Sequence, residues 1–267
     1  MKLKIKQIRN ATLKITYAGK TFLIDPWLIG KGKFGSFAEV PGFPFHVPDP
    51  VKEQIAMPIF DLPEPVEKIL AGVDCYVITH IHPDHIDLNF ADGTVGAPLN
   101  KNVTTFAQDE TDAAILKKSE FVDVKILSEN SLTIDEITIT KTPARHGIIK
   151  PMCNACGVIF QAENEKTLYI VGDTVWFEGV EKTLEKFNPD VVVMNCCAAE
   201  LVDNGRLIMN DEDVEIVSKT VPAAKLVITH MDNVAHASIT RHTMRGLLAK
   251  RGVEKYFMPN DGEVIEF

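Results

Sequence analysis

The chain has 267 residues, of which 45% are hydrophobic and 24% charged, and its formal net charge is −9. These are ordinary values for a globular protein, and the length suffices for one large α/β domain with a substantial core. The acidic balance argues against general binding of nucleic acid, which needs a basic face to neutralise phosphates. No apolar run approaches the length of a membrane span, so we expect no membrane association.

The start of the chain and its cysteines favour the cytoplasm. Residues 1–6 alternate between apolar residues and lysine, as in a strand, and lack the apolar centre of a secretory signal peptide. The five cysteines are an odd number, and two of them, Cys196 and Cys197, are adjacent. This is not the pattern of a disulfide framework, so we expect a protein of the reducing cytoplasm.

Strand and helix patterns alternate along the chain. Residues 3–27 contain two or three strands, including a hairpin whose turn contains Gly19. Further strands are expected within 121–142 and at 168–171, 190–194, 256–258 and 264–265. Helices are expected at 66–71, 106–118, 180–187, 210–220 and 239–251. No internal linker interrupts the pattern, which predicts a single layered α/β domain over residues 1–267.

Residues 28–66 differ from the rest of the chain. Glycine and proline recur too often for a long regular element. The segment carries Phe34, Phe37, Phe43 and Phe45 close together. Loops of this length are uncommon unless they have a function, so one hypothesis places this aromatic loop insertion at the mouth of a pocket. The alternative is a loop that packs its own phenylalanines on the surface or against another subunit.

The segment 79–85 reads Thr-His-Ile-His-Pro-Asp-His and follows an apolar run that we expect to be a strand. Three imidazoles, from His80, His82 and His85, and the carboxylate of Asp84 are side chains that bind zinc and neighbouring divalent metals. Such a density of polar groups at a strand end is unusual for a core and typical of a metal site.

Other strand-like runs also lead to potential ligands. Four residues follow such runs: Asp25, His146, Asp173 and His230. Alone, each has an ordinary interpretation, such as a turn residue for Asp25 or a helix cap for Asp173. The word Val-Ile-Thr-His occurs twice, at 77–80 and 227–230, as a fold with two similar halves would produce.

In combination, these motifs resemble the metallo-β-lactamase superfamily of metal-dependent hydrolases. The resemblance rests on His-x-His-x-Asp-His, a later lone histidine, Gly-Asp-Thr and Thr-His, and it extends from Asp25 to His230. It implies a four-layer αββα sandwich with metals at one edge of the two sheets. Within the superfamily, the chain looks most like the L-ascorbate-6-phosphate lactonase-like group of Zn-dependent hydrolases.

The resemblance implies two divalent metal ions, most simply zinc, with manganese or iron as alternatives. It assigns the ligands as follows: His80, His82 and His146 to one metal, Asp84, His85 and His230 to the second, and Asp173 to both. Three neutral nitrogens leave one coordination position for water. A hydroxide bridging the metals could then attack the substrate, and Asp84 and His85 are also predicted to be catalytic.

Some residues are weaker candidates for orienting ligands or contacting substrate: Asp25, Arg145, Asn195, Cys197 and His236. Asp25 could accept a hydrogen bond from a metal-bound histidine. Arg145 could bind an anion, although neighbours in sequence often point in opposite directions. His236 could contact substrate or could cap the following helix.

The cysteines leave two questions open. Asn195 and either Cys196 or Cys197 would line the site if their strand runs like its neighbours, whereas buried apolar cysteines are the alternative. Cys153 and Cys156 have CxxC spacing but no second pair, so no role is assigned to them.

The leading prediction is a cytoplasmic hydrolase that cleaves a small ester, lactone or phosphorylated metabolite. The phenylalanine-rich loop and the lactonase resemblance favour a homo-oligomer. A phosphodiesterase or nuclease of the same superfamily is one alternative, and a mononuclear-iron dioxygenase similar to persulfide dioxygenases is another. A non-catalytic metal-binding protein is the least expected, because such a protein should have lost some of its ligands.

Overall fold

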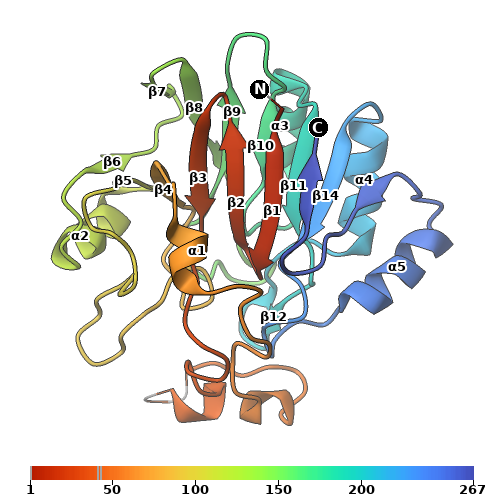
Figure 1. Cartoon of the computed structure of the whole chain (residues 1–267). Helices are drawn as coiled ribbons and strands as arrows, with labels where there is room; N and C mark the ends of the chain where they lie inside the picture. The colour runs from red at the N-terminus through yellow and green to blue at the C-terminus, as the bar shows by residue number, and fades with distance from the viewer. Residues whose placement is uncertain (1, 41, 43) are drawn as a thin grey trace.

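Two sheets form the centre of the molecule in the computed structural model, which describes residues 2–40, 42 and 44–267 (Figure 1). Pro41 and Phe43 of the aromatic loop therefore lie outside the described residues. The first sheet has the order β16 (Val264–Glu266), β1 (Lys4–Arg9), β2 (Thr12–Tyr17), β3 (Lys20–Ile24), β4 (Cys75–Ile78), β5 (Thr104–Ala107), β6 (Val124–Ile126). The second has the order β7 (Leu132–Ile134), β8 (Ile137–Pro143), β9 (Cys156–Gln161), β10 (Leu168–Ile170), β11 (Val191–Asn195), β14 (Lys225–Thr229), β15 (Tyr256–Phe257). A separate ribbon consists of β12 (Glu200–Leu201) and β13 (Gly205–Arg206).

The two sheets repeat one strand pattern. In the first, β16, β1, β2 and β3 are antiparallel, and β3, β4, β5 and β6 are parallel. In the second, β7 to β10 are antiparallel, and β10, β11, β14 and β15 are parallel. The fold thus has two similar halves. The repeated sequence Val-Ile-Thr-His, however, lies at the ends of β4 and β14. By position in its sheet, β4 corresponds to β11 and not to β14. The repeated sequence therefore does not mark equivalent positions in the two halves.

Helices cover the outer faces of both sheets. They are α1 (Val66–Leu70), α2 (Glu110–Lys118), α3 (Glu178–Phe187), α4 (Asp211–Thr220) and α5 (Arg241–Lys250). Leu116 of α2 packs in a buried cluster on the first sheet, and Leu184 of α3 and Leu248 of α5 pack in another cluster on the second sheet. A third cluster, with Phe22 and Phe160, fills the space between the sheets. This arrangement confirms the predicted αββα sandwich. Within the described ranges, no helix combines the length and apolar character needed to cross a lipid bilayer.

One predicted boundary is wrong. Residues 106–118 were expected to be a single helix, but Phe106 belongs to β5 and the helix begins at Glu110. Asp109 has extended backbone, and its side chain accepts hydrogen bonds from the N–H groups of Thr111 and Asp112, so it caps the helix there. Phe106 fits the apolar period of the helix, but its backbone pairs with β4 and β6 on either side.

The aromatic loop contains only two short 3₁₀ turns within its described residues, at Phe37–Glu39 and Lys52–Gln54. In Figure 1 it extends beyond the carboxyl end of β3. It is held to the second half of the chain by backbone hydrogen bonds, such as Ile59 N–H to the carbonyl of Asn233 at 3.1 Å. Phe37 is buried and its ring lies 5.3 Å from that of His236. The loop therefore packs toward the ends of the strands rather than only on itself.

A glycine in the second sheet gives a direct test of the packing between strands. A Cβ at Gly157 of β9 would lie 2.7 Å from the carbonyl oxygen of Val171 and 2.8 Å from that of Ile170. Gly157→Ala should therefore lower the free energy of unfolding by about 1–3 kcal/mol, measured by urea denaturation. The control is Gly246→Ala on the exposed side of α5, where no atom lies within 4 Å of the added Cβ. It should raise the stability by up to about 1 kcal/mol. Equal effects at the two sites would contradict the packing.

Candidate active site

Strand ends bring all seven predicted ligands together at one end of the two sheets. The contributing segments follow five strands: Asp25 after β3, residues 80–85 after β4, His146 after β8, Asp173 after β10 and His230 after β14. His80, His85 and His230 are completely buried. Because the segments are far apart in sequence, the packing of the two halves creates the site.

Three imidazoles form a first group. His80 Nε2 lies 2.9 Å from His82 Nδ1. Both His80 Nε2 and His146 Nε2 lie 3.9 Å from Asp173 Oδ2. A cysteine joins them, because the potential ligand atoms of these three histidines and the sulfur of Cys153 all lie within 4.8 Å of one another. The sequence assigned Cys153 no role.

The second group combines two imidazoles with carboxylates. His85 Nε2 lies 3.2 Å from His230 Nε2, and His230 Nε2 lies 3.4 Å from Asp84 Oδ2. Asp173 reaches this group as well, with Oδ2 at 3.2 Å from His85 Nε2 and Oδ1 at 3.8 Å from His230 Nε2. Asp173 thus lies between the two groups, as the resemblance implies.

Asp25 fixes the orientation of two rings. Its Oδ2 accepts a hydrogen bond from His85 Nδ1 at 2.9 Å and another from the hydroxyl of Thr79 at 2.7 Å. Because the Thr79 hydroxyl donates to Asp25, it accepts from His80 Nδ1, which lies 3.2 Å away. In both rings the hydrogen is therefore on Nδ1, and Nε2 is left to bind a proton or a metal ion.

Other neighbours hold the second half of the site. The carbonyl of Leu207 accepts a hydrogen bond from His146 Nδ1 at 3.1 Å, so His146 Nε2 also faces the cluster. Asn195 donates to Asp173 Oδ1 at 2.6 Å and orients that carboxylate. Together these bonds fix the ring of His146 and the carboxylate of Asp173, which must face both groups.

The two groups differ in charge. Burial and neighbouring imidazoles lower the pKa of His80 and bring that of His82 to about 3, so these rings are neutral. Burial alone would also lower the pKa of His85, but three neighbouring carboxylates raise it to about 10. Burial opposes ionisation of Asp84 and Asp173, yet the adjacent imidazoles hold both pKa values well below the ordinary range. The second group therefore stabilises positive charge.

This donor set fits divalent metal ions. Within the described part of the chain, His146 Nε2 is buried without a hydrogen-bond partner. That is the expected state of a nitrogen aimed at a cation. Neutral imidazoles and ionised carboxylates are the forms that bind metals, and the second group already favours a cation at His85. The residues could hold one ion at the three histidines and another at Asp84, His85 and His230.

A small, largely apolar cavity, partly open to solvent, borders the cluster. Its apolar wall consists of Phe37, Phe45, Met152, Leu201 and Leu207, and its polar wall includes His82, Asp84, His146, Asp173 and His236. A second, smaller cavity, lined in part by Trp27, Phe34 and Met57, shares Phe37 and His236 with it. Among the residues that the structure describes, no lysine or arginine lines either cavity.

The weaker candidates have different outcomes. Asp25 and Asn195 contact predicted ligands, as described above. Cys197 Sγ lies 3.5 Å from His230 Nδ1, on the far side of that ring from the cluster. His236 lines the cavity, and burial lowers its pKa to about 4. Arg145, in contrast, is exposed.

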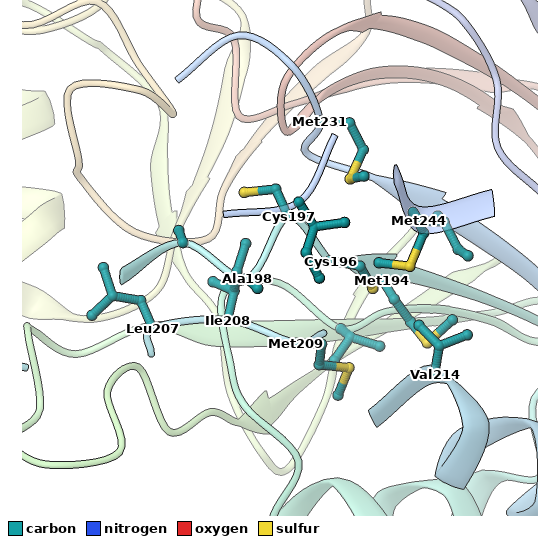
Figure 2. Packing of buried hydrophobic residues seen from close by; sticks show 14 of the residues in the cluster. Met194, Cys196, Cys197, Ala198, Leu207, Ile208, Met209, Val214, Met231 and Met244 are labelled. Atoms are coloured by element: carbon teal, nitrogen blue, oxygen red, sulfur yellow. The ribbon is translucent and has the colours of Figure 1, made fainter. Parts of the chain in front are cut away.

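Arg145 is not among the described residues that line the cavity. Its N–H donates to the hydroxyl of Thr174 at 2.8 Å, and its guanidinium donates to the carbonyl of Ile148 at 3.3 Å. The hypothesis that this arginine binds an anion at the site is therefore not supported. Cys196 also lies outside the cluster, buried beside Met194 and Met244 as the alternative interpretation proposed (Figure 2).

Sequence reasoning missed Asn10 and Cys153. Asn10 occupies the turn between β1 and β2 with φ of 51°. Its side-chain amide donates to the carbonyl of Asp84 at 3.0 Å, and its own carbonyl accepts from His230 N–H at 3.1 Å. An asparagine at a tight turn is an ordinary feature, so the sequence contains no signal for this contact between halves.

Comparison with known proteins agrees with the fold. A family model described as a beta-lactamase superfamily domain matches residues 21–231. The UPF0173 protein YddR of Bacillus subtilis (strain 168) is 34% identical over 270 residues, which cover 99% of this chain and 100% of that protein. A UPF0173 metal-dependent hydrolase of Xanthobacter autotrophicus (strain ATCC BAA-1158 / Py2) is 23% identical and covers 71% of this chain and 70% of its own length.

Two solved structures match almost end to end. The isothiocyanate hydrolase from Delia radicum gut bacteria is 36% identical, with a TM-score of 0.85 and 99% of each chain covered. A possible metal-dependent hydrolase from Veillonella parvula DSM 2008 is 35% identical, with a TM-score of 0.87 and the same coverage. These relatives support the superfamily and not the narrower lactonase-like group. Since the family model spans most of the chain and relatives match its full length, the chain belongs to the metallo-β-lactamase superfamily of metal-dependent hydrolases.

Proposed function

We propose that this chain hydrolyses small, uncharged molecules that carry an apolar group, and that isothiocyanates are the first class to test. The observation that carries the proposal is the apolar cavity beside the cluster of histidines and aspartates. The isothiocyanate hydrolase that matches the chain at 36% identity supports the choice of this class. Hydrolysis of R–N=C=S consumes one water and gives the amine R–NH₂ and carbonyl sulfide.

The lining of the cavity separates the substrate classes. Esters and lactones are uncharged and remain compatible with it. Only the proposed metals would offset the charge of a phosphorylated metabolite or a phosphodiester, because the described lining residues of the cavity include no lysine or arginine. Anion recognition in proteins normally uses such groups. We therefore rank phosphorylated substrates and the phosphodiesterase or nuclease alternative below uncharged ones.

Two divalent metals, zinc first, are part of the proposal. His80, His82 and His146 would hold one, Asp84, His85 and His230 the other, and Asp173 would contact both. Bound metals would act as Lewis acids and lower the pKa of a water molecule toward neutrality. The second group has all three of its predicted ligands, Asp84, His85 and His230, close together. This supports two metals rather than the single iron of a dioxygenase.

The chain's own residues orient and enclose the reaction. Asp25, directly and through Thr79, keeps the hydrogens of His85 and His80 on Nδ1. The apolar wall around Phe37 holds the apolar group of the substrate and excludes water from one side. Burial lowers the pKa of His236 to about 4, so the ring is neutral at physiological pH. It can therefore donate a hydrogen bond to an uncharged substrate without adding positive charge to the cavity.

We also propose a cytoplasmic location. The five cysteines, all within the described residues, form no disulfide, which fits a reducing compartment. The homo-oligomer, inferred from the phenylalanine-rich loop and the lactonase resemblance, remains a proposal that sedimentation of the purified protein would test.

Metal analysis is the first prediction. The purified protein should contain about two equivalents of divalent metal. His82→Ala should lose about one equivalent, and Asp173→Ala should lose affinity for both, because Asp173 faces both groups. His242→Ala, at an exposed position of α5, is the control and should keep both. Elemental analysis of the three variants checks this. One equivalent of iron in the unchanged protein would instead favour the dioxygenase alternative.

Asp25→Asn is the second prediction. Both carboxylate oxygens of Asp25 accept hydrogen bonds, but an amide has only one oxygen. Its NH₂ group would face a group that now donates to Asp25, such as His85 Nδ1 or the Thr79 hydroxyl. Metal affinity, measured by competition with a chelator, should fall about 10–100-fold. Asp74→Asn is the matched control, because the exposed Asp74 accepts one backbone N–H, from Thr21, which an amide oxygen can also accept. An unchanged affinity in Asp25→Asn would refute the orienting role.

Substrate preference is the third prediction. The metal-loaded protein should hydrolyse phenethyl isothiocyanate and an aryl acetate, and should not hydrolyse bis(p-nitrophenyl) phosphate. Phe37→Ala should raise the KM for the isothiocyanate about tenfold, as expected when about 1.4 kcal/mol of apolar contact is lost. Phe60→Ala, an exposed phenylalanine of the same loop outside both cavities, should leave KM unchanged. Faster cleavage of the phosphodiester than of either uncharged substrate would overturn the proposed class.

A further inference from the structure

A cysteine sulfur lies within the three-histidine group. Cys153 Sγ and the ligand atoms of His80, His82 and His146 are all within 4.8 Å of one another. Cys153 is half-buried and forms no disulfide. The sulfur therefore lies within 4.8 Å of a ring nitrogen of each of the three histidines.

Cys153 and Cys156 have CxxC spacing, but their side chains do not act together at one site. Cys156 is the first residue of β9, and its side chain is fully buried in the apolar cluster between the sheets. Cys153 lies in the loop before that strand and faces the histidines instead. The sulfur of Cys156 therefore lies in the core, whereas that of Cys153 lies at the histidine cluster.

The loop holds Cys153 in place from both sides. On one side, Met152 N–H donates to the carbonyl of His146 at 2.7 Å, which folds the chain back onto this histidine. On the other, the side chain of Gln108 donates to the carbonyl of Asn154 at 2.6 Å. The turn also requires glycine at Gly147, which has φ of 122°. Little conformational freedom remains to be lost when Cys153 binds a ligand.

His146 supplies an independent indication of a ligand at this position. Its Nδ1 donates to the carbonyl of Leu207, while its buried Nε2 has no hydrogen-bond partner among the described residues. A nitrogen aimed into the cluster in this state points to a cation that several donors share.

We propose that Cys153 is a fourth protein ligand, as thiolate, of the metal held by His80, His82 and His146. Imidazole and thiolate are donors typical of zinc sites, and the soft sulfur disfavours manganese and magnesium. On binding, the thiol proton passes to solvent and the sulfur–metal bond forms, without any change in oxidation state. The inference rests on the metal-binding part of the proposed function.

A cysteine ligand at the first group changes where a water molecule could bind. Cys153 would occupy the coordination position that three nitrogens alone would leave for water, and Asp173 also faces this group. The group of Asp84, His85 and His230, which Asp173 faces as well, has one protein donor fewer. The position for water would therefore lie in this second group.

Cobalt(II) loading tests the inference without measuring activity. A thiolate bound to cobalt(II) gives an intense near-ultraviolet charge-transfer band that imidazole and carboxylate ligands do not give. The cobalt-loaded protein should show this band, and Cys153→Ser should lose it while still binding cobalt at the second position. Cys197→Ser is the matched control, since Cys197 lies next to His230 but behind its ring. It should keep the band.

The outcomes separate the inference from the proposed function. Two bound cobalt ions without the band, or a band that disappears in Cys197→Ser and persists in Cys153→Ser, would overturn the role of Cys153 and leave the dinuclear site intact. No cobalt bound by the unchanged protein would overturn both. Circular dichroism and cobalt content of each variant exclude a loss of the band through unfolding.

Discussion

The carboxylate of Asp25 is the group on which the orientation of the site depends. It accepts hydrogen bonds from the backbone N–H of Thr79 at 2.8 Å, from the Thr79 hydroxyl and from His85 Nδ1. It is almost completely buried, so each of these bonds is made at low dielectric, where an unpaired group would cost most. The pairing of β3 with β4 places Asp25 beside Thr79, because Asp25 N–H continues the ladder to the carbonyl of Val77. The backbone register thus sets the direction of two imidazoles.

The second half of the fold contains a similar hydrogen bond to a carboxylate, but that carboxylate faces the cluster. Asp173 follows β10 as Asp25 follows β3, and Asn195 ends β11 as Thr79 follows β4. Asn195 donates to Asp173 as Thr79 donates to Asp25. Asp25, however, binds the nitrogen of His85 that faces away from the cluster, whereas Asp173 faces the cluster itself. Two similar halves therefore provide one carboxylate that orients and one that lies between the two groups of donors.

The sequence predicts the parts of the site that depend on short spacing and strand ends. The dense segment 79–85 identifies the cluster because four donors in six positions have no role in a core. The layers follow from the alternation of strands and helices. Cys153 could not be assigned in this way, because its position depends on the turn at Gly147 and on Gln108, far away in sequence. Phe106 was placed in a helix because its apolar period fits one, and only the neighbouring strands decide otherwise.

The two groups of donors offer a cation different surroundings. The first is neutral, nitrogen-rich and, with Cys153, soft, whereas the second is surrounded by carboxylates that hold positive charge on His85. The cavity wall around Phe37 and Leu207, beside these two groups, is apolar. The site thus places donors for metal ions next to an apolar surface. This combination is the physical basis of the proposal that the substrates are uncharged molecules with an apolar group.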